Sequence, residues 1–325
     1  MIKAGIIGGA GYTAGELLRL LFNHPDVEVV SVMSTSLAGS RLDEVHKGLV
    51  GETDMKFDSE LDLNAIDVLF CCTPHGASKT YIEAHPEISP ELRIIDLAAD
   101  YRLDDGTHDF VYGLPELNRK ATVRGAKHIA NPGCFATAIQ LALLPLAKHQ
   151  LLPDNVNVNA ITGSTGAGVK PGATTHYSWR NDNVSVYKPF THQHLAEINQ
   201  TLKRLQPSFS GDIDFIPMRG PFSRGIFASI TLKCDAPIEE LLRIYRDTYD
   251  DHSFTFVSES PIDLKDVVNT NKCLIHLDRH GKDKLLVTVA IDNLLKGATG
   301  TAVHNMNLLF GLSEKTGLNL KASAF

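Results

Sequence analysis

A glycine-rich turn near the start of the chain limits the available folds more than any other feature. The apolar run at residues 2–8 predicts a buried strand, and the leucine-rich face at residues 13–22 predicts a helix. Between them lies Gly8-Gly9-Ala10-Gly11-Tyr12-Thr13-Ala14-Gly15. Glycines let backbone N–H groups approach a pyrophosphate, and the helix N-terminus adds partial positive charge. The turn therefore indicates a dinucleotide site, with simple packing of helix on strand as the alternative.

Strand-like and helix-like segments continue to alternate through the first third of the chain. Apolar or β-branched runs at residues 27–33, 67–72 and 92–97 predict strands, and residues 77–84 predict a helix. Repeated strand, helix and strand are typical of a parallel sheet covered on both faces. We therefore expect an α/β fold with a Rossmann-type doubly wound parallel sheet.

The second part of the chain has longer extended runs and fewer helices. Extended segments are expected at residues 156–162, 225–234 and 285–291, and an amphipathic helix at 195–205. This pattern predicts an α+β domain with a mixed or antiparallel sheet. The change in the pattern of strands and helices predicts a domain boundary near residue 147.

Composition and charge narrow the class of protein. Of the 325 residues, 43% are hydrophobic and 21% are charged, which is unlike a disordered or coiled-coil chain. The net charge of −7 and the scattered lysines and arginines favour neither a nucleic-acid nor a membrane partner. No apolar run reaches the roughly 20 residues of a membrane span, and no signal peptide is recognisable. Five cysteines without a C-x-x-C pair fit a reducing compartment, so we expect a cytoplasmic protein.

The residues that follow the second strand determine whether such a domain prefers NAD or NADP. NAD-preferring sites place an Asp or Glu there to bind the ribose hydroxyls. This chain instead has Ser34 and Ser36, followed by Arg41. Hydroxyl groups and a guanidinium suit a 2′-phosphate, so NADP(H) is expected, and an ordinary polar loop is the alternative. Pro74 and His75 follow the third strand, where such a sheet presents loops to the cofactor.

The segment Asn131-Pro132-Gly133-Cys134 carries the strongest chemical signal. Asn131 is a favourable N-cap and Pro132 suits the first helical position, which places Cys134 in the first turn of a helix. A helix N-terminus stabilises a thiolate, and its N–H groups can hold an oxyanion. Together with a nucleotide fold, this cysteine indicates aldehyde–acyl chemistry through a thioester. Packing is the alternative, and it is the expected role of the other four cysteines.

A thiolate nucleophile needs a proton partner. His192 and His194 precede the helix expected at residues 195–205. A helix N-terminus favours a neutral imidazole, which suits a general base. We place His192 before His194, with His75 as a weaker rival. Helix capping or metal binding are the alternatives, but no second cluster has ligand spacing, so no metal is expected.

Further motifs accompany the turn and the cysteine in a fixed order. They are residues 8–16, 74–76, 96–102, 112–116, 131–137 with Pro145, 163–168, 192–198, 219–220 and 292–300. Together they resemble the N-acetyl-γ-glutamyl-phosphate reductase family of arginine biosynthesis, over nearly the whole chain. The usual His-Arg-His-x-Pro-Glu-Ile pattern of that family reads His-Gln-His-Leu-Ala-Glu-Ile here. This departure leaves an N-succinyl substrate open beside the N-acetyl one.

The resemblance implies an enzyme that reduces an acyl phosphate with NADPH. The expected reaction converts N-acetyl-γ-glutamyl phosphate into N-acetylglutamate 5-semialdehyde and phosphate through a cysteine thioester, in a homodimer or homotetramer. Aspartyl phosphate and carrier-linked aminoadipyl phosphate are alternative substrates. A non-catalytic NADP-binding regulator and a metal-dependent hydrolase are alternatives from other classes.

The resemblance also implies domain limits and site residues. An apolar helix at residues 299–312 should return to the first domain, which gives an NADP-binding domain of 1–147 with 299–325 and a catalytic domain of 148–298. The implied catalytic residues are Cys134, His192 and His194. The implied cofactor residues are Gly8, Gly11, Tyr12, Thr13, Ala14, Ser34, Ser36, Arg41, Pro74, His75, Asn293 and Gly297. The implied substrate residues are Arg102, Asn131, Ser164, Gly166 and Arg219.

Overall fold

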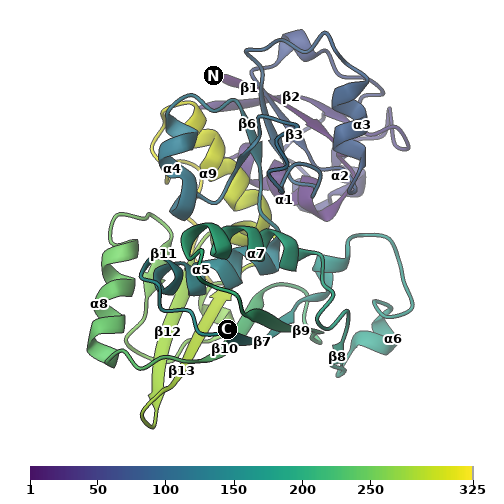
Figure 1. The fold of residues 1–325 in the computed structure, drawn as a ribbon. Coiled ribbons are helices and arrows are strands. Elements are labelled where there is room, and N and C mark those ends of the chain that lie inside the picture. The colour runs from purple at the N-terminus through teal and green to yellow at the C-terminus, as the bar shows by residue number, and fades with distance from the viewer. Residues whose placement is uncertain (324–325) are drawn as a thin grey trace. The chain divides into compact units, whose positions relative to one another are not determined.

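The computed structural model describes residues 1–323, which fall into two compact units (Figure 1). Unit 1 comprises Met1–Gly133 and Ala298–Asn319, so the last helix belongs with the N-terminal segment. Unit 2 comprises Cys134–Gly297 and the residues from Leu320 onward. This division falls one helix before the boundary expected near residue 147, since helix α5 (Cys134–Lys148) packs on the sheet of unit 2.

The described residues of unit 1 form a six-stranded sheet in the order β2-β1-β3-β4-β6-β5, and every pairing is parallel. The strands are β1 (Ile2–Ile7), β2 (Val27–Met33), β3 (Val68–Cys71), β4 (Arg93–Asp96), β5 (Val111–Tyr112) and β6 (His128–Ala130). The helices are α1 (Tyr12–Leu21), α2 (Leu42–Val45), α3 (Ala77–Glu83), α4 (Pro115–Val123) and α9 (Gly300–Leu309). Helix α9 contacts α1, α4 and β4. The Rossmann-type parallel sheet is therefore confirmed.

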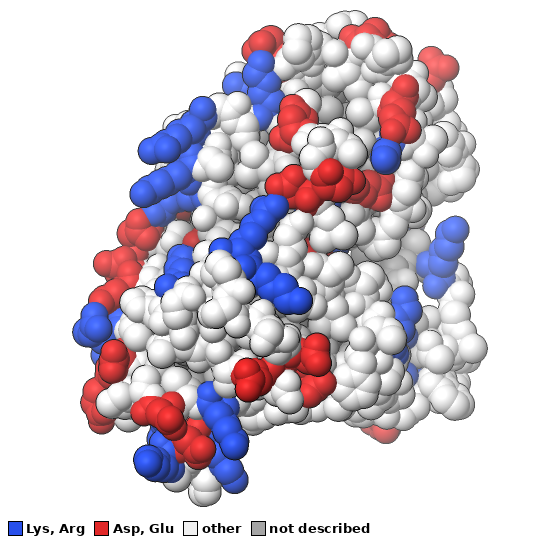
Figure 2. Space-filling model, viewed as in Figure 1, with Lys and Arg blue, Asp and Glu red and all other residues white. Residues whose placement is uncertain are grey.

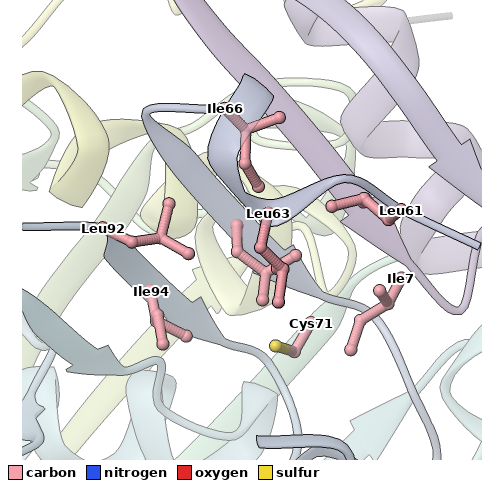
Figure 3. Packing of buried hydrophobic residues seen from close by; sticks show 8 residues of the cluster. Ile7, Leu61, Leu63, Ile66, Cys71, Leu92 and Ile94 are labelled. Atoms are coloured by element: carbon pink, nitrogen blue, oxygen red, sulfur yellow. The ribbon is translucent and has the colours of Figure 1, made fainter. Parts of the chain in front are cut away.

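One core of unit 1 lies between the sheet and α3 (Figure 3). Ile7, Leu69 and Ile94 come from three neighbouring strands, and each is almost fully buried. Tyr81 and Ile82 of α3 pack against this cluster. Because helices also contact the sheet elsewhere, all four residues of β3 are buried, as in a parallel sheet covered on both faces.

The described residues of unit 2 form a seven-stranded sheet in the order β11-β12-β13-β10-β7-β9-β8. Pairs β7–β9 and β11–β12 are parallel and the others antiparallel, so the sheet is mixed, as expected. The strands are β7 (Asn155–Thr162), β8 (Ser185–Val186), β9 (Asp212–Arg219), β10 (Ile226–Lys233), β11 (Thr255–Val257), β12 (Cys273–His280) and β13 (Lys284–Ile291). The helices of this unit are α5, α6 (Tyr177–Arg180), α7 (His194–Leu205) and α8 (Ile238–Tyr249).

One face of this sheet is covered by α5, α7 and α8 (Figure 1). Side chains alternate along β7, where Val156 and Val158 are buried and Asn157 is exposed. Almost all of α5 is buried, and it packs on β10, β12 and β13 and contacts both α7 and α8. The hydroxyl of Tyr245 in α8 donates to the carbonyl oxygen of Ala142 in α5 at 2.6 Å. This packing holds the first turn of α5, and with it Cys134, on a rigid support.

The surface in view carries both signs of charge (Figure 2). Lys and Arg side chains are interspersed with Asp and Glu side chains over this face. Across residues 1–323, no helix combines the length and the apolar character that crossing a membrane requires.

Candidate active site

The turn between β1 and α1 leaves backbone N–H groups accessible at the start of the helix. Gly8 has φ of +76°, and a Cβ there would lie 2.6 Å from the carbonyl oxygen of Cys72, so only glycine suits this position. Gly11 is the N-cap of α1 without a side-chain capping bond, and a Cβ on it would meet nothing within 4 Å. The turn therefore fits a pyrophosphate at the N–H groups around Tyr12 and Thr13, with Ala14 buried beneath.

The loop after β2 carries the expected 2′-phosphate residues. Ser34 is buried and Ser36 is exposed. The Arg41 guanidinium pairs with the Asp43 carboxylate at 2.7 Å and with Asp54 at 2.8 Å. Its hydrogen bond holds the pKa of the Asp43 carboxyl below the usual range. The loop thus offers hydroxyls and a guanidinium, but carboxylates already occupy that guanidinium.

The turn at Pro74 and His75 is held by the segment after β4. The exposed His75 ring accepts a hydrogen bond at Nδ1 from the Ala99 N–H at 3.1 Å, so its neutral form carries the proton on Nε2. The Asp100 carboxylate accepts from the Gly76 N–H at 2.6 Å, at the start of α3. These bonds fix the loop where a doubly wound sheet receives a dinucleotide.

Asp96 is a fully buried carboxylate at the end of β4. It accepts hydrogen bonds from the Ser78 hydroxyl at 2.6 Å and the Ala98 N–H at 3.0 Å. Burial raises its pKa to about 6. Burial also raises the pKa of the Cys71 and Cys72 thiols, and the Asp96 charge adds to the effect. These two cysteines are therefore protonated packing residues.

Arg102 and Asn131 are buried and bond to the main chain. Arg102 Nε donates to the Asn131 carbonyl oxygen at 2.9 Å, and Arg102 Nη2 donates to Leu97 at 3.0 Å. Asn131 Nδ2 donates to the carbonyl oxygen of Ala298 at 3.0 Å. Both side chains thus organise the segment that leads to Cys134.

The expected capping of the cysteine helix is wrong in its details. Helix α5 begins at Cys134 itself, two residues after Pro132. Asn131 is not the residue that precedes this helix, because Pro132 and Gly133 lie between them, and its Nδ2 donates to the Ala298 carbonyl oxygen. Cys134 is still in the first helical turn, where N–H groups lack intrahelical acceptors.

The end of unit 2 closely approaches Cys134. Gly297 lies in a π-helical turn, Leu295–Thr299, after β13. A Cβ on Gly297 would lie 2.8 Å from the Cβ of Cys134, so a larger residue there would displace the cysteine. Gly297, which the resemblance assigns to the cofactor, is in this structure a neighbour of the nucleophile.

Both expected histidines lie beside the start of α5. The Phe135 ring centroid is 5.5 Å from that of His192 and 6.2 Å from that of His194, and both imidazoles are about 95% buried. His192 Nδ1 accepts the His194 backbone N–H at 3.2 Å, so a neutral His192 has its proton on Nε2. Burial lowers the pKa of His192 to about 4, with a smaller contribution from the Lys188 charge. His194 Nε2 lies 4.0 Å from the Glu197 carboxylate.

A cationic group, Arg219, lies over the ring of Tyr187, whose pKa is also influenced by Cys134. Arg219 ends β9, with its guanidinium carbon 4.7 Å from the centre of the Tyr187 ring and Nη1 donating to Thr174 Oγ1 at 3.3 Å. Its Nε is buried and makes no hydrogen bond among the described residues. Burial raises the pKa of Tyr187, and so does the nearby Cys134. Arg219 is thus placed to bind a carboxylate or a phosphate near the nucleophile.

Arg180 supports this corner of the site and was not anticipated from the sequence. Its guanidinium donates to three carbonyl oxygens, at Thr174 (3.2 Å), Asn183 (2.9 Å) and Arg219 (2.6 Å), and to the Ser185 hydroxyl (2.9 Å). Burial lowers its pKa. No sequence motif indicates Arg180. Its acceptors are mostly backbone carbonyl oxygens, which every residue type has, so the identities of its partners do not reveal the contacts. Tyr187 was also missed, since an isolated tyrosine carries no spacing signal.

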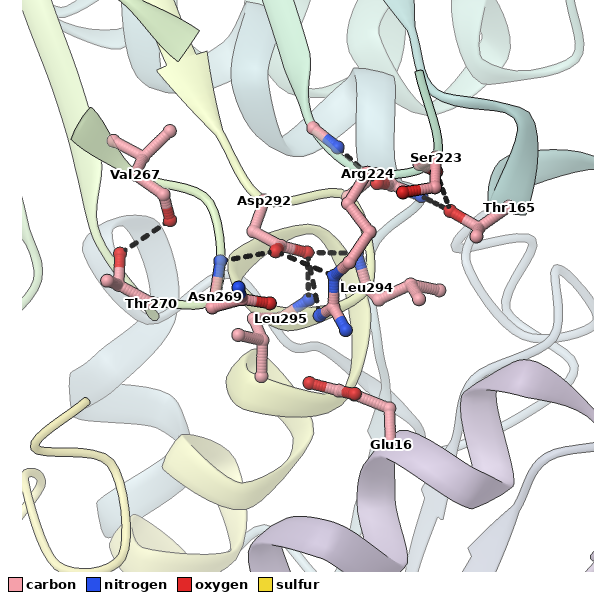
Figure 4. A network of polar contacts seen from close by, with 12 residues as sticks. Glu16, Thr165, Ser223, Arg224, Val267, Asn269, Thr270, Asp292, Leu294 and Leu295 are labelled. Carbon is pink, nitrogen blue, oxygen red and sulfur yellow. Dashed lines mark hydrogen bonds and ion pairs between the residues drawn. The ribbon is translucent and has the colours of Figure 1, made fainter. Parts of the chain in front are cut away.

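A buried carboxylate organises several loops of unit 2 (Figure 4). Asp292 is fully buried and accepts from Arg224 Nε at 3.0 Å, from the Asn269 N–H at 2.8 Å and from the Leu294 N–H at 2.8 Å. Asp292 belongs to the 292–300 motif, but its partner Arg224 lies 68 residues earlier and was not anticipated.

Asn293 fixes the loop that carries two expected substrate residues. Its Oδ1 accepts the Gly225 N–H at 2.6 Å, and its Nδ2 donates to Thr165 Oγ1 at 3.0 Å. Thr165 lies in the short 3₁₀ helix Ser164–Ala167, where Ser164 is half-buried and Gly166 is exposed. Asn293, which the resemblance assigns to the cofactor, thus supports the substrate loop here.

The remaining cysteines, Cys234 and Cys273, are buried, and no disulfide bond joins any of the five. Within residues 1–323, no group of three or more His, Cys, Asp or Glu side chains is arranged to hold a metal ion.

Two family models match the chain in tandem. Residues 3–124 match the NAD-binding domain of semialdehyde dehydrogenases, and residues 134–293 match their dimerisation domain. A protein of Bacteroides fragilis named N-acetyl-gamma-glutamyl-phosphate reductase is 64% identical over 325 residues, which cover all of both chains. One of the same name from Phocaeicola vulgatus is 63% identical over the same span. This chain belongs to the N-acetyl-gamma-glutamyl-phosphate reductase family. The expected family is therefore confirmed.

Solved structures with low identity share the fold of this family member. Aspartate semialdehyde dehydrogenase II of Vibrio cholerae, complexed with ASA, has a TM-score of 0.72 at 17% identity, covering 96% of this chain and 98% of that one. Aspartate semialdehyde dehydrogenase of Candida albicans with NADP has a TM-score of 0.73 at 16% identity, covering 95% and 98%. Together with the matched domains, they establish a semialdehyde dehydrogenase fold with a dinucleotide-binding domain.

The neutral state of His192 makes stability depend on pH. Its pKa is about 4 in the folded chain, against 6.5 for an unperturbed histidine, so between these values the unfolded chain binds the extra proton. The free energy of unfolding should therefore fall as pH drops from 6.5 towards 4. His192→Gln should reduce that fall, measured as urea midpoints at pH 7 and pH 5. The exposed His149→Gln is the control and should keep the wild-type difference; an unchanged difference in His192→Gln would contradict the neutral assignment.

Proposed function

We propose that this chain reduces N-acetyl-γ-glutamyl phosphate with NADPH to N-acetylglutamate 5-semialdehyde and phosphate. The observation that carries the proposal is the placement of Cys134 at the first residue of α5, with both histidines packed on the adjacent Phe135. The relatives that share the sequence over its full length carry the matching name. A reactive thiolate with a proton carrier is what acyl transfer from a phosphate needs.

Cys134 acts as the nucleophile. Its thiolate attacks the γ-acyl carbon, a C–S bond forms, and the acyl–oxygen bond to phosphate breaks. N–H groups in the first turn of α5 stabilise the oxyanion of the tetrahedral intermediate. The proton removed from the thiol leaves with the phosphate. Bound NADPH supplies the hydride that reduces the thioester.

The two histidines have different roles in this proposal. His194 takes the thiol proton, since the Glu197 carboxylate 4.0 Å from its Nε2 favours the imidazolium that results. His192 stays neutral at pH 7, because its Nδ1 is occupied and its pKa is about 4. His192 therefore acts as an Nε2–H donor. After the thiol proton has left with the phosphate, His194 takes up a proton from water and donates it to the hemithioacetal oxygen. It recovers this proton when the C–S bond breaks and the semialdehyde leaves.

Substrate recognition rests on the loops around the cysteine. Arg219 binds an anionic group of the acyl phosphate, and Ser164 and Gly166 line the neighbouring loop. Arg102 and Asn131 act indirectly, by holding the main chain that leads to Cys134.

NADP(H) is the proposed dinucleotide. The turn at Gly8, Gly11, Tyr12, Thr13 and Ala14 would hold the pyrophosphate, as the uncapped start of α1 supports. Ser34, Ser36 and Arg41 would hold the 2′-phosphate. Pro74 and His75 would border the nicotinamide end, with Asn293 and Gly297 supporting the loops around Cys134.

The chain is proposed to work as a homodimer or homotetramer in the cytoplasm. Residues 134–293 match a dimerisation domain. The other face of the unit 2 sheet carries the half-buried apolar side chain of Ile161, which suits contact with a second copy. The absence of a disulfide bond among the five cysteines fits a reducing compartment.

The acyl group of the substrate is tested by running the reaction in reverse. With phosphate and NADP⁺, the chain should reduce NADP⁺ faster with N-acetylglutamate semialdehyde than with the N-succinyl compound. Aspartate semialdehyde should give little activity. Omission of phosphate is the control and should stop the reaction. Absence of NADP⁺ reduction with any of the aldehydes would overturn the proposed function.

The covalent route is tested at the nucleophile. Cys134→Ser should lower kcat at least about 10³-fold, because a serine hydroxyl is not ionised at this helix terminus. NADP(H) binding, followed by fluorescence, should stay within about twofold of wild type. Cys273→Ser, at a buried cysteine with no proposed chemistry, is the control for loss of a thiol. Substantial turnover by Cys134→Ser would exclude the thioester.

The division of labour between the histidines is tested with matched variants. His194→Gln should lower kcat about 10²- to 10⁴-fold and slow alkylation of Cys134 by iodoacetamide at pH 7, because the proton acceptor is lost. His192→Gln should cost less and leave alkylation nearly unchanged, because glutamine retains an N–H donor. The reverse order of the two effects would assign the base to His192.

A further inference from the structure

Every nitrogen of the Arg41 guanidinium faces a carboxylate oxygen. Nε and Nη2 donate to the two oxygens of Asp43 at 2.9 and 2.7 Å, in a bidentate pair. Nη1 lies 2.8 Å from an oxygen of Asp54. A phosphate that binds Arg41 through Nη1 therefore has to replace Asp54.

The two carboxylates differ in how firmly they are held. The Asp43 side chain is 11% exposed and lies in the first turn of α2, so it is fixed by the fold. The Asp54 side chain is 91% exposed and meets Arg41 through one oxygen. Exposed single-contact ion pairs are weak, because water solvates both partners and a long side chain loses freedom. Asp54 is thus the partner that an anionic ligand can displace.

The charges around Arg41 are otherwise balanced. Lys56 is paired with Arg41 across an isolated β-bridge, and the Glu44 carboxylate accepts the Arg41 backbone N–H at 3.3 Å. Lys47 lies near enough to Asp43 to lower the pKa of its carboxyl. In this segment the three cations Arg41, Lys47 and Lys56 are matched in number by the three anions Asp43, Glu44 and Asp54. A dianionic phosphate is attracted more strongly when the Asp54 charge moves away.

We propose that Asp54 competes with the 2′-phosphate of NADP(H) for Arg41, while Asp43 holds the guanidinium in place for both. Asp54 is thereby a specificity-determining residue that reduces the preference for NADP(H) over NAD(H). This inference rests on the proposed NADP(H) site. NAD(H) lacks the 2′-phosphate, so this competition does not change the affinity for NAD(H).

The test measures dissociation constants of the intact protein for NADP⁺, NAD⁺ and 2′,5′-ADP by titration calorimetry. Asp54→Asn should tighten NADP⁺ and 2′,5′-ADP about three- to tenfold and change NAD⁺ less than twofold. The gain should shrink as salt is raised from 0.05 to about 0.5 M, because salt screens exposed charges. Asp43→Asn should weaken NADP⁺, since Arg41 loses its fixed partner. Glu28→Gln, which removes one exposed negative charge within β2, is the control and should leave all three values unchanged.

The outcomes separate this inference from the cofactor proposal. Wild-type protein that binds neither NADP⁺ nor 2′,5′-ADP would overturn the NADP(H) site and this inference with it. Wild-type binding of NADP⁺ with no selective gain in Asp54→Asn would overturn only the role of Asp54. An equal gain in Glu28→Gln would do the same, because it would show an effect of net charge alone.

Discussion

The buried Asp292 carboxylate holds together the loops of unit 2 beside Cys134, the proposed nucleophile. A charge taken out of water is tolerated only with several strong partners, and Asp292 has Arg224 together with backbone N–H groups from two different loops. The carbonyl oxygen of Asp292 also accepts the N–H of Gly297 at 2.9 Å. One residue thus fixes the turn that brings Gly297 against the cysteine, and Asn293 next to it fixes the substrate loop through Thr165.

A second constraint divides the chemistry between the histidines. In the proposed mechanism, two contacts distinguish the histidines: His192 Nδ1 accepts the His194 N–H, and the Glu197 carboxylate lies 4.0 Å from His194. The first denies His192 an acceptor nitrogen, and burial among Phe135, Tyr187 and other rings disfavours its charged form. The second supports the role of proton acceptor proposed for His194. Two adjacent imidazoles of the same burial are thereby suited to opposite tasks.

Local features of this molecule were predictable and distant contacts were not. The glycine turn, the strand–helix alternation and a cysteine in the first turn of a helix follow from short-range periodicity and backbone sterics. Arg102 is expected near the substrate because a guanidinium suits anions, but its contacts with the Asn131 and Leu97 carbonyls could not be predicted from the sequence. The position of Asn131 predicts an N-cap, but its side-chain amide donates to the carbonyl oxygen of Ala298, which is distant in the sequence. Both outcomes depend on segments that the chain brings together only on folding.

The five cysteines show how placement decides reactivity when residue type is constant. Cys71 and Cys72 end a strand of the parallel sheet, where burial and the Asp96 carboxylate both oppose a negative charge on sulfur. Cys134 instead lies at the first residue of a helix, where the helix dipole favours negative charge. The surroundings of Cys71 and Cys72 therefore keep their thiols protonated and unreactive. The helix start places Cys134 in a positive potential. In a chain of this fold, a cysteine at the start of a helix and one at the end of a strand have different environments. This position predicts the chemistry of the thiol better than burial alone.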